Sequence, residues 1–210
     1  MRRLSRIGGG LYVTIIVLGF CEAALIREPI VVSGNAAATA ANLMSMQGLW
    51  RLGIASDFVV LCCSIVLAMI LYRLLRPVSS FLAGVAVLLN LVSFAVEATA
   101  NLVLVAAMLP LSKASYLNAF TDDQKFAFSS LAIREYNYGF GAALIFFGLE
   151  CVILGYLIYR SGYLPKTVGV LMCAAGTAYL VNSFSLIVAP AFATLLFPAI
   201  LLPALVGESS

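Results

Sequence analysis

The chain alternates long apolar runs with short polar segments, a pattern typical of helices that cross a membrane. A transmembrane helix needs about 20 mostly apolar residues to cross about 30 Å of hydrocarbon. Six candidate runs cover residues 7–26, 52–72, 81–109, 138–159, 168–188 and 191–206. The pattern therefore predicts an all-α, polytopic transmembrane helix bundle of six spans, folded as a single transmembrane domain over residues 1–210.

The distribution of positive charge sets the predicted orientation. Seven of the 12 Lys and Arg residues lie in the N-terminal tail and two short turns without acids: Arg2, Arg3, Arg6, Arg73, Arg76, Arg160 and Lys166. The other five lie in longer loops that also contain acids. Because cytoplasmic loops carry the excess of Lys and Arg, we expect both termini in the cytoplasm. Residues 2–24 also resemble a cleavable signal peptide, but we interpret them as part of the first span.

Two short motifs predict helices in the outer loops. Asn35 can cap a helix over residues 35–50, in which Leu43, Met46 and Trp50 share one face. We interpret this segment as a short interfacial helix; the alternative is a loop helix packed on the bundle, with Trp50 in the aromatic belt. In the second outer loop, residues 121–124 (TDDQ) have the spacing of a capping box. The fourth helix is therefore expected to start near Asp122 and to be longer than the membrane is thick.

Composition excludes several classes of protein. Hydrophobic residues make up 63% of the chain and charged residues 10%, against about 45–50% and about 25% in soluble domains. The chain contains no histidine, which excludes Ser-His-Asp triads, His-ligated haem and His-Glu-x-x-His zinc sites. No basic motif suggests nucleic-acid binding. We therefore expect an integral membrane protein in contact with the lipid bilayer, without a cofactor or metal site.

The strongest candidates for function are acids within the spans. Each of the first four spans carries one carboxyl group, namely Glu22, Asp57, Glu97 and Glu150. An ionisable group at membrane depth costs about 2.5–3.5 kcal/mol even on the lower scales and is functional by default. Glu22, Asp57 and Glu97 fall in the outer third of their spans, whereas Glu150 is isolated nearer the middle. We expect the first three to line one outward-facing polar cavity. Three arginines of the outer loops are expected just above it, namely Arg27, Arg51 and Arg134.

A polar stripe on the third span supports this expectation. Asn90, Ser93, Glu97 and Asn101 recur at helical spacing on one face of the predicted helix. A helix does not turn such a face toward lipid, so the stripe must face protein or water. The predicted polar cluster therefore comprises Glu22, Asp57, Asn90, Glu97 and Asn101. The alternative is that these groups form interhelical hydrogen bonds with a purely structural role.

Small residues on the fourth span predict a close helix contact. Gly141, Gly148 and Gly155 recur every seven residues, almost on one face. Glycines in this pattern let another helix approach closely. The fifth span offers Gly169 and Gly176 in the same way. The fourth-span glycines are thus candidate contacts for a second copy of the chain or for another membrane protein.

Several segments together resemble a known family. They are FFGLEC at 146–151, LGYLIYRSGYLP at 154–165, GVL at 169–171, NAAATAANLMSMQGLWRLG at 35–53 and YLVNSF at 179–184. The chain resembles the bacterial integral-membrane family catalogued as domain of unknown function 4386. The resemblance implies a multi-pass protein of the cell inner (plasma) membrane. It implies no activity, substrate or catalytic residue.

Two functional interpretations follow, with a third less favoured. The first is a bundle that binds or translocates a proton, a cation or a small solute through the outward-facing cavity. The second is an accessory or structural subunit that associates with another membrane complex, which the small size and the glycine pattern favour. An intramembrane enzyme is the least favoured, because without histidine its chemistry would rest on carboxylates alone.

Overall fold

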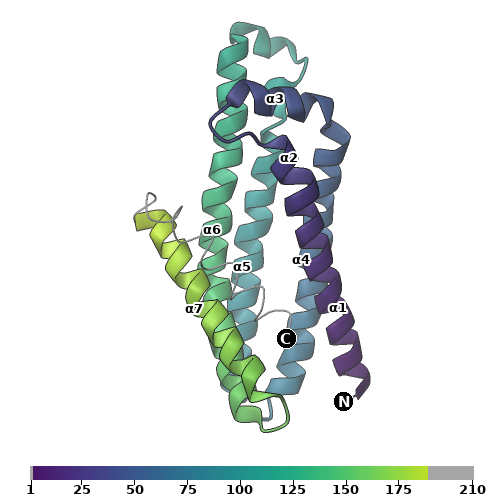
Figure 1. Ribbon diagram of the computed structural model, residues 1–210, viewed down its shortest axis with the longest axis vertical. Coiled ribbons are helices and arrows are strands. Elements are labelled where there is room, and N and C mark those ends of the chain that lie inside the picture. Colours follow the sequence, from purple (N-terminus) through teal and green to yellow (C-terminus); the bar gives the residue numbers. More distant parts are fainter. Residues whose placement is uncertain (1, 189–210) are drawn as a thin grey trace. The chain divides into compact units, whose positions relative to one another are not determined.

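The computed structural model describes residues 2–188, and every regular element within them is a helix (Figure 1). The α-helices are α1 (Arg2–Cys21), α2 (Glu28–Ile30), α3 (Ala36–Ser45), α4 (Gln47–Leu75), α5 (Ser80–Ala106), α6 (Asp122–Ser161) and α7 (Lys166–Val188). A π-helical turn, Glu22–Arg27, joins α1 to α2, and two short 3₁₀ helices, Leu109–Leu111 and Ser115–Ala119, follow α5. The all-α prediction is confirmed for this part of the chain.

Five helical segments of the described chain are long and apolar enough to cross a membrane. They are Ile7–Ile30, Gln47–Leu75, Ser80–Leu111, Asp122–Ser161 and Lys166–Val188. They correspond to the first five predicted spans. Because of these helices we describe the chain as a membrane protein. The sixth predicted span, residues 191–206, lies outside the described residues. The orientation in the membrane stays a prediction.

The capping box places the start of the long fourth helix as predicted. The backbone N–H of Thr121 donates to Gln124 Oε1 at 2.9 Å, and the N–H of Gln124 donates to Thr121 Oγ1 at 3.4 Å. From there α6 continues for 40 residues to Ser161, about 60 Å at 1.5 Å per residue. Gly162 follows in the left-handed conformation, with φ of 72°, which favours glycine directly after a helix.

The loop between the first two spans contains the predicted short helix, but the end of this helix and the role of Trp50 differ from expectation. Asn35 Oδ1 caps α3 by accepting from the N–H of Ala38 at 2.9 Å, and the helix ends at Ser45. Trp50 belongs to α4 and is only 2% exposed. Its indole N–H donates to the Leu104 carbonyl at 3.1 Å. Trp50 is therefore not a belt residue, because its polar group has an internal partner.

The described chain forms two compact units. The first contains residues 2–9, 65–97 and 140–188, and the second contains residues 10–64 and 98–139. The core of the first unit joins the end of α4 and the start of α5 to α6, through Leu75, Ala83, Ala86, Leu154, Leu157 and Ile158. The second unit buries Ile30, Leu43, Trp50, Leu104, Ala107 and Tyr136.

Within the first unit, the glycines of α6 pack against α7. A Cβ atom on Gly155 would lie 2.6 Å from the Gly169 carbonyl oxygen, and one on Gly148 would lie 2.9 Å from the Gly176 carbonyl oxygen. A Cβ on Gly141 would lie 2.6 Å from Leu186 Cδ2. The predicted close approach is thus made by α7 of the same chain. Association of Gly141, Gly148 and Gly155 with a second copy or another protein stays a prediction.

Candidate functional site

The site begins with a local irregularity in the first span. Residues five apart in an α-helix lie about 140° apart around its axis, so Glu22 and Arg27 would point in different directions. In a π-helix, residue i bonds to residue i+5, and such turns are frequent at functional sites. The π-turn Glu22–Arg27 therefore brings its first and last side chains to the same side of the helix.

Pro29 gives a sequence reason for the wider turn. A proline ring in a helix clashes with the carbonyl group four residues earlier, here that of Leu25, and it provides no N–H group to bond. A π-bulge is one of the recognised ways in which a helix accommodates such a perturbation. Directly before Pro29, the N–H of Glu28 bonds to the Ala23 carbonyl, five residues earlier. A wider turn is therefore the local response that a proline at this position favours.

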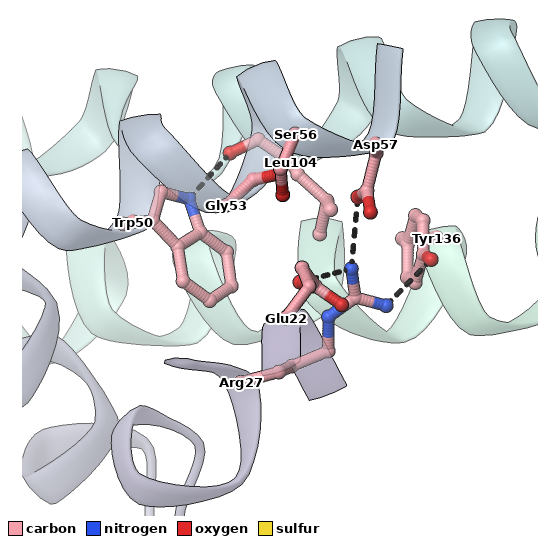
Figure 2. A network of polar contacts seen from close by, with 8 residues as sticks. All are labelled: Glu22, Arg27, Trp50, Gly53, Ser56, Asp57, Leu104 and Tyr136. Carbon is pink, nitrogen blue, oxygen red and sulfur yellow. Dashed lines mark hydrogen bonds and ion pairs between the residues drawn. The ribbon is translucent and has the colours of Figure 1, made fainter. Parts of the chain in front are cut away.

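Arg27 is the centre of the site (Figure 2). Its Nη2 donates to Glu22 Oε1 at 2.5 Å and to Asp57 Oδ2 of α4 at 3.1 Å. Its Nη1 donates to the Tyr136 hydroxyl oxygen of α6 at 2.5 Å. The guanidinium also lies over the Tyr136 ring, 4.4 Å from the ring centroid, within the range of a cation–π contact. We call Glu22, Arg27, Asp57 and Tyr136 the Arg27 cluster.

The Arg27 cluster is largely buried and its charges are unequal. The side chains of Glu22 and Asp57 are 8% and 12% exposed, and that of Arg27 is 20% exposed. One guanidinium thus faces two carboxyl groups, while the phenol is neutral. With both carboxyl groups ionised, the cluster would carry one negative charge in excess. A buried excess charge is costly unless another group neutralises it.

On the α4 side, the Arg27 cluster lies close to the backbone at Gly53. A Cβ atom on Gly53 would lie 3.1 Å from Ile26 Cγ2 and 3.6 Å from Glu22 Cγ. The absence of a side chain at Gly53 therefore lets the π-turn lie close to α4. Ser56, beside Asp57, donates its hydroxyl proton to the Gly53 carbonyl at 2.7 Å (Figure 2).

Two side chains cap the end of α5 beside the cluster. The last four carbonyl groups of a helix have no partner within it. Trp50 donates to the Leu104 carbonyl, and the Ser129 hydroxyl donates to the Ala107 carbonyl at 2.8 Å. These bonds fix α5 against α4 and α6 in the second unit.

Asn101 is a fully buried amide in the same unit. Its residue is 0% exposed, and neither amide atom has a hydrogen-bond partner among the described residues. A Cβ on Gly139 would lie 2.9 Å from Ala100 Cβ, and Ser129 bonds to Ala107. Because α5 and α6 run antiparallel between these two contacts, Tyr136 lies within about one helical turn of the level of Asn101.

The structure brings together only part of the polar set expected from the sequence. Glu22 and Asp57 meet through Arg27, which lies inside the cluster and not above it, because the π-turn directs its side chain inward. Arg51 and Arg134 are exposed. Glu97 belongs to the other compact unit, so its place in one cavity with Glu22 and Asp57 stays a prediction.

Tyr136 is the member of the cluster that sequence reasoning missed. A helical stripe could have revealed it, because Ser129, Ile133 and Tyr136 are all buried and spaced four and three residues apart. A tyrosine on such a stripe needs a partner for its hydroxyl group. The long-range partner, 109 positions earlier in the chain, has no signal in the sequence.

The first unit contains a separate polar pair. Asn90 Nδ2 of α5 donates to Glu150 Oε2 of α6 at 2.7 Å, and both residues are 4% exposed. One turn further along α5, the Ser93 hydroxyl donates to the Ala143 carbonyl at 2.9 Å. The predicted stripe is therefore buried at Asn90, Ser93 and Asn101.

Comparison with known proteins identifies the family of the chain. A family profile described as domain of unknown function (DUF4386) matches residues 7–210. The chain belongs to the DUF4386 family. This DUF4386 protein is also 32% identical, over 129 residues, to an uncharacterised protein of Archaeoglobus fulgidus. The alignment covers 61% of this chain and 64% of that relative, and no solved structure matches the chain.

The charges of the Arg27 cluster decide what this DUF4386 protein can bind there. Within residues 2–188, no three His, Cys, Asp or Glu side chains come together as possible metal ligands. The Arg27 cluster offers two carboxyl groups beside a fixed positive charge. With both carboxyl groups ionised, one further positive charge would make the cluster neutral. A proton can supply this charge without displacing Arg27.

Proposed function

We propose that this protein lies in the plasma membrane with its N-terminus in the cytoplasm and binds one exchangeable proton at the Arg27 cluster. The observation that carries the proposal is the pairing of one guanidinium with two largely buried carboxyl groups. The proposed orientation rests on the seven Lys and Arg residues of the N-terminal tail and short turns.

The proton follows from the charge balance of the cluster. Two ionised carboxylates that share one counter-charge repel each other, and burial weakens the screening of that repulsion. A proton shared by Glu22 and Asp57 makes the cluster neutral and leaves one carboxylate paired with Arg27. Removing either acid also makes the cluster neutral, so each single variant should fold without taking up the proton.

Two further groups supply a polar environment for proton exchange or for a small solute. Arg27 Nε and the amide of Asn101 are buried and have no partner among the described residues. Buried polar groups are otherwise nearly always hydrogen-bonded. Since Asn101 lies near the level of Tyr136, both groups support a polar path beside the cluster. We therefore extend the proposal to translocation of the proton, alone or together with a small polar solute.

Infrared spectroscopy of the purified protein tests the bound proton. Wild-type protein at neutral pH should show a carboxylic-acid carbonyl band that disappears in Asp57→Asn and equally in Glu22→Gln, because either change removes the charge excess. The matched control is Glu28→Gln, which changes an exposed acid one residue beyond the π-turn and should leave the band in place. If neither cluster variant loses a carboxylic-acid band that the wild type shows, the proposal is overturned.

Proteoliposomes test translocation. With a pH-sensitive dye enclosed, an imposed pH gradient should decay faster with wild-type protein than with Asp57→Asn, while Glu28→Gln behaves as wild type. Equal decay in the three samples would remove translocation from the proposal and leave proton binding to the infrared test.

A further inference from the structure

Glu150 and Asn90 form a second polar site, in the unit that does not contain the Arg27 cluster. Glu150 Oε2 accepts from Asn90 Nδ2 at 2.7 Å, and the pair joins α5 to α6. Each residue is 96% buried. The bond uses one oxygen of the carboxyl group and the nitrogen of the amide.

Among the side chains that the structure describes, no Lys or Arg forms an ion pair with Glu150. Within this unit, the basic residues of α4 and α6 lie in the last turns of those helices, at Arg73 and Arg160, and α5 contains none. Arg160 is ten residues beyond Glu150, about 15 Å along the helix. In α7, Lys166 is the first residue. An ionised Glu150 would therefore be a buried charge without a counter-ion, which is the most costly state of a carboxyl group in an apolar environment.

The amide of Asn90 provides an independent argument. Its Oδ1 atom is buried and has no hydrogen-bond partner among the described residues. A carboxylate only accepts hydrogen bonds, whereas a carboxylic acid also donates one. The nitrogen of the Asn90 amide already bonds to Glu150. The amide group is therefore directed at the acid, and the unpaired oxygen belongs to this same group.

We infer that Glu150 holds a proton and forms with Asn90 a two-bond acid–amide pair, a second proton-binding site of this protein. Asn90 Nδ2–H donates to one carboxyl oxygen, and the O–H of the acid donates to Asn90 Oδ1. The single proton removes the buried charge and satisfies the unpaired acceptor. Unlike the Arg27 cluster, this site holds its proton without any cation beside it.

The remaining ionisable groups on the helices of this unit do not supply the missing charge. On α5, Glu97 lies two turns from Asn90 and is itself an acid. On α4, α6 and α7 the remaining groups are two thiols and four phenols, those of Cys151, Cys173, Tyr72, Tyr156, Tyr159 and Tyr179. The Cys173 thiol donates to the Val152 carbonyl at 3.4 Å, and the Tyr179 ring packs on Phe147. Neutral thiols and phenols leave the charge of Glu150 unbalanced, and an ionised Glu97 would oppose a second negative charge.

The same infrared measurement tests the inference separately from the proposed function. At neutral pH, Glu150→Gln should lose one carboxylic-acid band that persists in Asp57→Asn, in Glu22→Gln and in the Glu28→Gln control. Asn90→Leu should keep this band but shift it to higher frequency, because the acid loses its amide partner. Identical spectra of Glu150→Gln and the wild type would show that Glu150 is ionised and overturn the inference.

Stability provides a second readout. Glutamine can replace the protonated acid in both hydrogen bonds, because its amide donates to Asn90 Oδ1 and accepts from Asn90 Nδ2. Glu150→Gln should therefore unfold at the wild-type temperature near neutral pH and stay folded at alkaline pH values where the wild type loses its proton. A variant with the same loss of stability at alkaline pH as the wild type would contradict the acid–amide pair.

Discussion

The contact between α6 and α7 makes a quantitative prediction for Gly155→Ala. The added Cβ atom would lie 2.6 Å from both Cys173 Sγ and the Gly169 carbonyl oxygen, and 2.7 Å from the Cys173 backbone nitrogen. Ordinary contacts begin at 3.4 Å, so the backbone of α7 must move by about 0.8 Å. A gap of about 0.5–1 Å between α6 and α7 would remove about a quarter to a half of the energy of each dispersion contact between them. Overpacking of this kind costs about 1–3 kcal/mol.

Gly84→Ala is the matched control. Gly84 lies inside α5 in the same unit, and a Cβ atom there would meet nothing within 4 Å. Both substitutions gain about 0.5–1 kcal/mol from the lower backbone entropy of alanine in the unfolded chain. Their difference therefore isolates the overpacking cost, and Gly155→Ala should be less stable than Gly84→Ala by about 1–3 kcal/mol.

The assay is unfolding of the purified protein in mixed micelles with increasing sodium dodecyl sulfate, followed by circular dichroism. Gly84→Ala should equal or exceed the wild type in its free energy of unfolding, and Gly155→Ala should fall below it. Equal stabilities of the two variants would refute the reasoning, because they would mean that α7 does not occupy the space beside Gly155.

Two further predictions concern the second unit and the orientation of the chain. Trp50→Phe should lower the free energy of unfolding by about 1–3 kcal/mol, because it leaves the buried Leu104 carbonyl unpaired. The control Tyr116→Phe changes an exposed position and should have no effect. A Trp50→Phe variant with wild-type stability would contradict the hydrogen bond to Leu104. Cysteines placed at Ser33 and Asp122, in a chain without its five natural cysteines, should react in intact cells with a reagent that does not cross membranes. Labelling only after the cells are permeabilised would reverse the proposed orientation.

The helices of this protein follow largely from the sequence itself. Backbone groups within a membrane must bond inside their own segment, so the length and apolar character of a run are enough to predict a helix. The start of α6 at Asp122 and of α3 at Ala36 depends on side chains within three residues of the cap, and such local bonds are visible in the sequence. The spacing of the α6 glycines likewise predicted a close helix contact.

Only the tertiary structure decided which polar side chains meet. The π-turn replaces an expected α-helical turn, and it reverses the prediction that Arg27 lies above the acids. Arg27 then contacts Asp57, 30 positions later, and Tyr136, 109 positions later. Periodicity places a side chain on a face of its own helix, but it does not fix the register between helices. That register depends on packing at contacts such as Gly53 with Ile26 and Gly139 with Ala100, which form only when the helices come together.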